Sequence, residues 1–219
     1  GTRTDGLQPE TFVTFLDNHD QIANSGDGSR VHHRTAPGVY RATDEVLNRS
    51  VVIKLMQARG HDKRLLKSRF EHEMNALAHI DHPGVVGILD VGELEDGTPF
   101  LVIQHISGIS LREAILQGPI SGPRSAAMLR QIGAALEAAH SLGIAHRDLK
   151  PENIMLQTLN DGTELVKLID FGLAKIEESA VEANPSTIGL AGTIRYMAPE
   201  QFQGESSTAS DLYALGLIA

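Results

Sequence analysis

Two short motifs constrain this chain more than any other part of its sequence. The first runs from His146 to Asn153 and reads His-Arg-Asp-Leu-Lys-Pro-Glu-Asn, and the second, Asp-Phe-Gly, begins at Asp170. They bring a carboxylate that can act as a base (Asp148), a cation (Lys150) and two oxygen ligands (Asn153 and Asp170) into one segment. These are the groups needed to transfer a phosphoryl group that is held on magnesium. The motifs therefore point to phosphoryl transfer.

Two further motifs accompany them. A strand-like run, Val-Val-Ile-Lys, ends at Lys54, and Ala-Pro-Glu occupies residues 198–200. With these motifs the chain resembles the eukaryotic-type serine/threonine protein kinases, in particular their bacterial branch, from about Tyr40 to its last residue. Lys150, two residues after Asp148, is the serine/threonine form of the motif. The resemblance implies an α+β, two-lobed protein-kinase-like fold that uses ATP and Mg²⁺.

The resemblance also implies roles for the residues of the catalytic motifs. Asp148 would accept or orient the proton of the substrate hydroxyl, and Lys150 would neutralise charge on the transferring phosphoryl group. Asn153 and Asp170 would hold Mg²⁺ between the phosphates. The expected protein partner is a substrate with a serine or threonine acceptor.

Other residues would hold the nucleotide. Lys54 would bind the α- and β-phosphates and pair with Glu73, which lies beside the apolar stripe of a helix-like run. Gln104 and Ile106 would form the hinge, where the backbone C=O of Gln104 and the backbone N–H and C=O of Ile106 hold the adenine.

Regulation is expected in the loop between residues 173 and 191. Arg147 resembles the arginine of kinases whose loop is ordered by a bound phosphate. Ser179, Ser186 and Thr187 are the candidate acceptors, and Thr187 is the one we expect.

Residues 1–38 do not follow the kinase pattern. Counting back from Val39, the three places for the glycines of the phosphate loop hold His32, Arg34 and Pro37. The segment 11–21 resembles the Asn-His-Asp region of the α-amylase superfamily, and its continuation to Gly38 resembles the trehalohydrolases of that superfamily. We therefore expect a foreign segment over 1–38, a small lobe with hinge over 39–106 and a large lobe over 107–219.

The expected kinase fold is incomplete. The small lobe should lack a normal first strand and a glycine-rich loop, and the large lobe should be cut within its central helix. That helix resembles the one whose aspartate, here Asp211, braces the catalytic loop. We expect such a chain to transfer phosphate poorly, because glycine lets backbone N–H groups approach the phosphates closely.

Hydrophobic periodicity predicts several elements. Residues 85–89 and 100–103 read as strands of a hairpin, and a second hairpin turns at residues 160–162. A long helix should follow Pro123, with an apolar stripe that contributes to the core: Ala126, Leu129, Ile132, Leu136 and Ala139.

Composition narrows the class of function. A net charge of −9 argues against a nucleic-acid binder, and the absence of cysteine excludes disulfides and fits a reducing cytoplasm. No apolar run is long enough to span a membrane, so we expect no membrane contact from these residues. Kinases of this branch often continue into a membrane segment, which leaves the anchoring of a longer protein open, and the oligomeric state is unknown.

Two alternative functions belong to other classes. The first is a pseudokinase, a non-catalytic nucleotide-binding or scaffold module. The second, an α-glucan-processing enzyme fragment, rests only on residues 11–38, where His19 and Asp20 would line a sugar site. Retaining glycosidases need a pair of carboxylates, and the strands that would carry the others are not in this chain.

Overall fold

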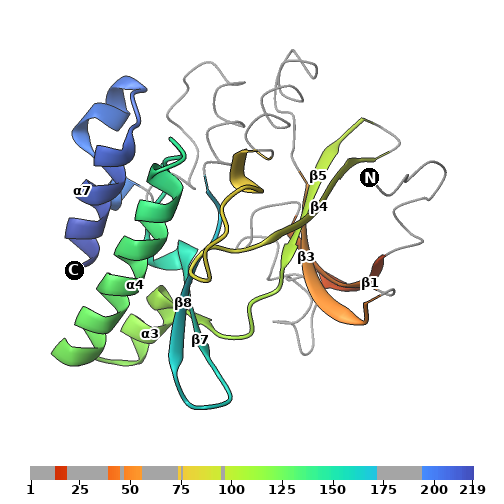
Figure 1. Cartoon of the computed structure of the whole chain (residues 1–219), viewed down its shortest axis with the longest axis horizontal. Coiled ribbons are helices and arrows are strands. Elements are labelled where there is room, and N and C mark those ends of the chain that lie inside the picture. Colours follow the sequence, from red (N-terminus) through yellow and green to blue (C-terminus); the bar gives the residue numbers. More distant parts are fainter. Residues whose placement is uncertain are drawn as a thin grey trace, which may run out of the picture. The chain divides into compact units, whose positions relative to one another are not determined.

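The computed structural model describes residues 13–18, 39–44, 47–55, 74, 76–94, 97–171 and 194–219, with the backbone alone for residues 13–18. The chain divides into two compact units (Figure 1). The first unit contains residues 1–58 and 87–105, and the second contains residues 59–86 and 106–219. Each unit has its own hydrophobic core.

The first unit is built on an antiparallel sheet with strand order β1-β2-β3-β5-β4. Its described strands are β1 (Val13–Asn18), β2 (Val39–Asp44), β3 (Arg49–Leu55), β4 (Ile88–Glu93) and β5 (Pro99–Gln104). The predicted strand that ends in Lys54 and the predicted hairpin are therefore confirmed, with the first hairpin strand beginning three residues later than expected.

Strand β1 lies within residues 1–38, where the sequence predicts no normal first strand of the small lobe. It pairs antiparallel with β2, from Val13 opposite Asp44 to Asn18 opposite Tyr40, so part of residues 1–38 belongs to the sheet. The strand begins Val-Thr-Phe, and β-branched and aromatic residues of this kind favour an extended backbone. Residues 32, 34 and 37 themselves lie outside the described residues.

The core of the first unit lies on one face of its sheet. Ala42, Val51, Ile53 and Val102 are buried, and they come from three neighbouring strands. In β3 the buried residues alternate with less buried ones, as expected when one face of a sheet packs on a core. Lys54 comes directly after the buried Ile53, which places it on the opposite face.

The second unit combines helices with a three-stranded antiparallel sheet of order β6-β7-β8. Its described elements are β6 (Ile109–Ser110), α3 (Leu111–Gln117), α4 (Gly122–His140), β7 (Ile154–Thr158), β8 (Glu164–Leu168) and α7 (Thr208–Ile218), with short 3-10 helices η2 (Pro151–Asn153), η3 (Ile194–Tyr196) and η4 (Pro199–Gln203). Figure 1 shows α3, α4 and α7 in the part that also carries β7 and β8. The predicted hairpin with its turn at residues 160–162 is confirmed.

Helix α4 is the predicted long helix. Pro123 lies in its first turn, where a proline is tolerated because the N–H it lacks has no helical partner. Of the predicted stripe, Ile132, Leu136 and Ala139 are buried in the core of this unit. The helix packs against β8 and α7.

Polar side chains of α4 also fix the edge of the small sheet. Gln131 Nε2 donates to the backbone oxygen of Glu164 at 3.1 Å, and its Oε1 accepts from the backbone N–H of Val166 at 3.0 Å. Arg124 forms two bonds with the Glu164 carboxylate, at 2.6 and 3.2 Å. The two Gln131 bonds pair backbone groups that an edge strand leaves open, and together with the Arg124 pair they hold the strand that leads to Asp170.

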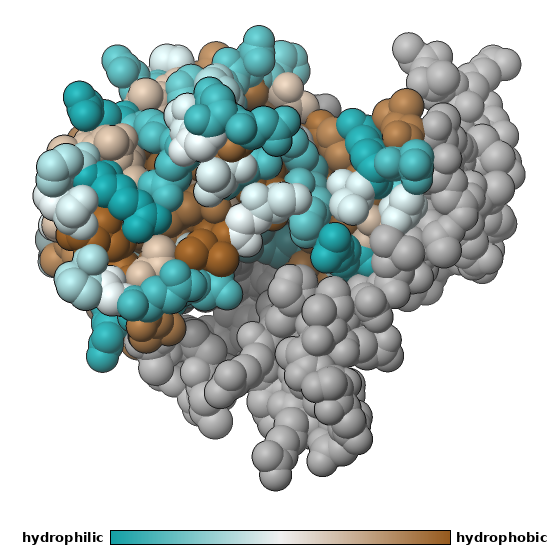
Figure 2. Space-filling view, turned by 90° about the horizontal axis from the view of Figure 1, so that it is seen from below, coloured by the Kyte–Doolittle hydropathy of each residue, from teal (hydrophilic) through white to brown (hydrophobic). Residues whose placement is uncertain are grey.

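Apolar side chains remain on the surface of the second unit. Figure 2 shows hydrophobic side chains lying between hydrophilic ones on the described part of one face. Phe202, Leu212 and Leu217 are 63%, 57% and 49% exposed. Among the helices that the structure describes, none has the length and hydropathy of a membrane span.

Candidate active site

The loop between α4 and η2 carries the first catalytic motif, and His146 anchors it. The His146 side chain is completely buried, its Nε2 lies 2.9 Å from the backbone oxygen of Ile169, and its Nδ1 lies 3.4 Å from the backbone nitrogen of Asp148. A carbonyl accepts and an amide N–H donates, so these contacts require a neutral ring with its proton on Nε2. The imidazole therefore connects the catalytic loop to the segment that follows β8.

Asp211 at the start of α7 holds the backbone of this loop. Its carboxylate is 1% exposed, and it accepts from the backbone N–H of His146 at 2.7 Å and from that of Arg147 at 2.8 Å. His140, the last residue of α4, places its Nε2 2.8 Å from the same carboxylate. The expectation that Asp211 braces the catalytic loop is confirmed.

Asp148, Lys150 and Asn153 form a single polar cluster. Lys150 Nζ donates to Asp148 Oδ2 at 2.8 Å, and Asn153 Nδ2 donates to the same oxygen at 3.0 Å. Asn153 Nδ2 also donates to the backbone oxygen of Asp148 at 2.8 Å. The side chains of Asp148 and Lys150 are 15% and 19% exposed, so the pair sits in a partly desolvated place where charge interactions are strong.

Asp170 is brought next to this cluster by the backbone of β8. The Ile169 N–H donates to the Asn153 oxygen at 3.0 Å, which ties the residue before Asp170 to η2. Asp170 has a positive φ of 63°, a conformation that residues other than glycine rarely adopt. Phe171 is buried, and its ring lies 4.5 Å from the ring of His146, centroid to centroid.

The donor set of this cluster fits a hard cation. Both hydrogen bonds of the Asn153 side chain use Nδ2, which leaves its oxygen for a metal ion, and Asp170 offers carboxylate oxygens. Amide and carboxylate oxygens are the ligands that Mg²⁺ prefers, alongside water and phosphate oxygens. No group of three or more His, Asp or Glu side chains suited to a metal occurs among the described residues, so a metal held here would need ligands from a bound phosphate or from water.

The neutral state of His146 makes stability depend on pH. Burial lowers the pKa of His146 from its ordinary value of 6.5, against the opposing influence of nearby carboxylates such as Asp211. As the pH falls below about 6.5, His146 binds a proton in the unfolded chain but not in the folded chain. The stability that is present above that pH is therefore lost. We expect the urea midpoint to fall between pH 7.5 and pH 5, and His146→Asn to weaken this dependence. An equal slope in the unaltered chain and in His146→Asn would contradict the assignment.

The structure brings some of the predicted site residues together, and the others lie elsewhere in the chain or outside the described residues. Asp148, Lys150 and Asn153 are in direct contact, and Asp170 is linked to them through the backbone. In the first unit, Lys54 lies on β3 and Gln104 ends β5, while Ile106 is buried in the second unit. Glu73, Ser186 and Thr187, with the other candidate acceptor Ser179, lie outside the described residues.

Sequence reasoning missed two residues that contact this site. Gln201 Nε2 donates to the backbone oxygen of Arg147 at 2.9 Å, and His140 lies against Asp211. Gln201 comes directly after the Ala-Pro-Glu motif, a position that the motif itself leaves unspecified. His140 is the last residue of a helix with an apolar stripe, and no motif around it indicates a contact with Asp211.

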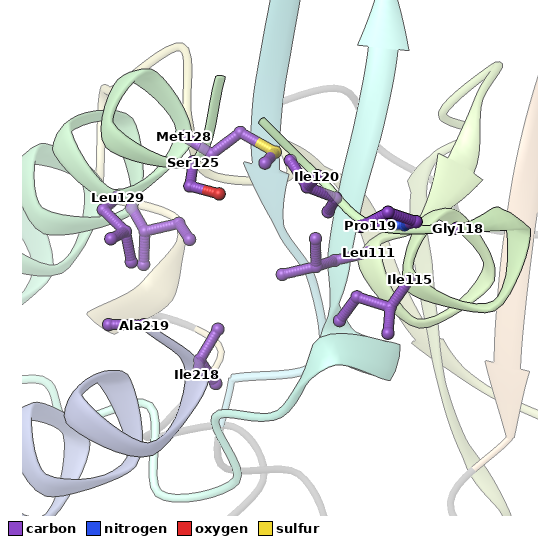
Figure 3. A pocket seen from close by; sticks show the side chains of 11 residues that line it. Leu111, Ile115, Gly118, Pro119, Ile120, Ser125, Met128, Leu129, Ile218 and Ala219 are labelled. Atoms are coloured by element: carbon purple, nitrogen blue, oxygen red, sulfur yellow. The ribbon is translucent and has the colours of Figure 1, made fainter. Parts of the chain in front are cut away.

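An apolar pocket of about 280 Å³ in the second unit is not a second catalytic centre. Figure 3 shows Leu111, Leu129 and Ile218 around it, from three different helices. Ser125 supplies the only polar side chain among its lining residues, so it offers no acid, base or cation. A much smaller pocket, of about 10 Å³, lies beside Arg147 and Asp148 and is also lined by Tyr196 and Gln201.

Comparisons with known proteins agree with the motifs. A family model described as the protein kinase domain matches residues 35–219. The chain is 35% identical over 184 residues to serine/threonine-protein kinase pkn3 of Myxococcus xanthus, covering 82% of this chain and 34% of that one. It is 38% identical over 183 residues to serine/threonine-protein kinase PknD of Mycobacterium tuberculosis, covering 82% and 26%. The chain thus spans about a third or less of the length of these relatives.

A third match bears on the N-terminal residues. The chain is 35% identical over 209 residues to the probable serine/threonine-protein kinase PknB of Lactococcus lactis, covering 93% of this chain and 31% of that one. This match covers 93% of the chain, more than residues 39–219 alone would give, so it extends into residues 1–38. The resemblance of residues 11–38 to trehalohydrolases finds no support in these comparisons.

Proposed function

Because the chain belongs to the protein kinase family, in its bacterial serine/threonine branch, we propose that it transfers the γ-phosphate of ATP to serine or threonine hydroxyls of a protein substrate. The observation that supports this activity best is the contact of Asp148 with both Lys150 and Asn153. A scaffold that had lost catalysis would have no need to keep a base, a cation and a metal ligand in one cluster. The pseudokinase reading is therefore not favoured.

In the proposed reaction, Asp148 receives the substrate hydroxyl and accepts or orients its proton as the oxygen attacks. Lys150 already lies 2.8 Å from this carboxylate, so its ammonium is placed to offset negative charge on the transferring phosphoryl group. Asn153 donates to Asp148 Oδ2 and thereby fixes the orientation of the base. Because the three side chains are already hydrogen-bonded to one another, Asp148 and Lys150 would meet the reacting oxygens with little reorganisation of the cluster.

Asn153 and Asp170 are the residues that we propose for Mg²⁺. Held by these two residues, the ion would supply positive charge that offsets the negative charge developing on the phosphates. The backbone bond between Ile169 and Asn153 sets the spacing of the two ligand residues. The rigid hairpin of β7 and β8 lies between them in the sequence and supports both.

For the nucleotide we propose the residues that the resemblance implies. Lys54 would hold the α- and β-phosphates with Glu73 as its partner, and the backbone of Gln104 and Ile106 would hold the adenine. We further propose that the reaction takes place in the cytoplasm, on proteins and not on nucleic acids, in keeping with the net charge of −9.

The experiment that tests this function measures transfer of labelled γ-phosphate from Mg-ATP to a generic basic protein. Because His32, Arg34 and Pro37 occupy the expected glycine places, we expect weak nucleotide binding, and the assay needs Mg-ATP at high concentration. Label on serine and threonine of the acceptor is the expected result. Binding of Mg-ATP without any transfer would favour the pseudokinase, and label on tyrosine would contradict the specificity.

We also propose that Thr187 is an autophosphorylation site. Its phosphate would pair with Arg147 through charge-assisted hydrogen bonds and order the loop between residues 173 and 191. After incubation with Mg-ATP, mass spectrometry should find phosphate on Ser186 or Thr187, and Asp148→Asn should prevent it. Phosphate found only elsewhere in the chain would contradict this proposal.

A further inference from the structure

Gln201 connects two parts of the second unit that are far apart in the sequence. It lies in η4, and its Nε2 donates to the backbone oxygen of Arg147 at 2.9 Å. Its Oε1 accepts from the backbone N–H of Ala198, also at 2.9 Å. The amide therefore has two distinct ends. Its nitrogen donates to the catalytic loop and, at 3.5 Å, to Ser206 Oγ, and its oxygen accepts from the start of its own helix.

The bond to Arg147 acts on the peptide plane that leads into Asp148. The other polar atom of that plane is the backbone nitrogen of Asp148, which donates to His146 Nδ1 at 3.4 Å, a longer and therefore weaker hydrogen bond. The bond from Gln201 is thus the shorter restraint on the plane. A peptide plane is rigid, so its rotation would carry the Cα of Asp148 and displace the carboxylate.

Arg147 needs this restraint because its backbone has a φ of +66°. L-residues other than glycine rarely adopt such a conformation, since the Cβ comes too close to the following carbonyl oxygen. Asp211 holds the peptide plane before Arg147 through its N–H at 2.8 Å, and Gln201 holds the plane after it. The left-handed conformation at Arg147 is therefore fixed from both sides by side chains of later elements.

We propose that Gln201 is a positioning residue for phosphoryl transfer, which aligns Asp148 by holding the oxygen of Arg147. The inference rests on the proposed function, because the alignment of Asp148 matters to the rate only if Asp148 serves the reaction. Gln201 acts through the backbone of another residue and contacts no group that we assign to the nucleotide. Its loss should lower kcat and leave the KM for Mg-ATP unchanged.

Three variants separate the two ends of the Gln201 amide. Gln201→Glu keeps the acceptor for Ala198 and sets an oxygen against the Arg147 oxygen, whereas Gln201→Lys keeps a donor and removes the acceptor. Gln203→Glu makes the same chemical change at an exposed position of the same helix and is the matched control. We expect Gln201→Glu to lower kcat roughly ten- to a hundredfold, as small misplacements of a catalytic group do. Gln201→Lys should retain more of kcat, and Gln203→Glu should match the unaltered chain.

Hydrogen exchange at the amides of Arg147 and Asp148 supplies a readout that needs no turnover. It should be faster in Gln201→Glu than in Gln203→Glu. If Gln201→Glu keeps both its kcat and its slow exchange, the residue only caps its own helix and the inference is overturned. If Gln201→Glu fails to fold, the comparison of Gln201→Lys with Gln201→Met decides, and equal kcat values would overturn the inference.

The same experiment separates this inference from the function on which it rests. Absence of phosphate transfer by the unaltered chain would count against the proposed function alone. Faster hydrogen exchange in Gln201→Glu would then still support the proposal that Gln201 restrains the catalytic loop. Unchanged exchange would reject that proposal.

Discussion

Replacing Asp148 by Asn should lower the rate of phosphate transfer about a thousandfold or more, which corresponds to a loss of roughly 4 kcal/mol of transition-state stabilisation. The amide retains an oxygen of similar position for Lys150 and Asn153, so the loop should keep its structure. What it loses is the capacity to take the proton of the attacking hydroxyl. Asp170→Ala should have an effect of similar size, because it removes a proposed magnesium ligand.

The measurement is transfer of labelled phosphate to a generic basic protein at saturating Mg-ATP. Asp161→Asn is the matched control, since Asp161 lies in the exposed turn between β7 and β8 and bonds locally to Thr163. It should behave as the unaltered chain does. Turnover that survives unchanged in Asp148→Asn or Asp170→Ala would remove the corresponding residue from the proposed mechanism.

The parts of the site that the sequence predicts are those whose geometry is local. Asp148, Lys150 and Asn153 lie close together in the sequence, and the single short turn of η2, which ends at Asn153, brings their side chains into contact. Helix α4 is predicted for a comparable reason, because its apolar period shows which face is buried. In both cases the information is carried by residues that are close in the chain.

The parts that the sequence does not predict depend on contacts across long distances in the chain. Gln201 meets Arg147 across 54 positions, and His140 meets Asp211 across 71. Neither glutamine nor histidine at such a place has a local pattern that distinguishes it from a surface residue. Strand β1 pairs with β2, yet the three expected glycine places before β2 hold His32, Arg34 and Pro37, so the local pattern does not predict this pairing.

Asp211→Ala should destabilise the second unit by about 3–5 kcal/mol, the cost of removing one partner from a buried, charged set of bonds. The carboxylate is 1% exposed, and its loss would leave the backbone N–H groups of His146 and Arg147 without an acceptor. Single domains are typically stable by only about 5–15 kcal/mol, so a change of this size removes a large share of the total. Asp211→Asn should cost less, because one oxygen remains to accept from one of the two amides.

Urea unfolding followed by hydrogen exchange at the catalytic loop and in α4 measures this effect, with Glu137→Ala as an exposed acidic control on a neighbouring helix. The order of stability should be the control first, then Asp211→Asn, then Asp211→Ala. Protection of the loop amides should be lost in Asp211→Ala before that of the α4 core, because the carboxylate bonds directly to the amides of His146 and Arg147. If Asp211→Ala unfolds at the same urea concentration as the control, the left-handed Arg147 is held by other contacts, and the catalytic loop does not depend on α7.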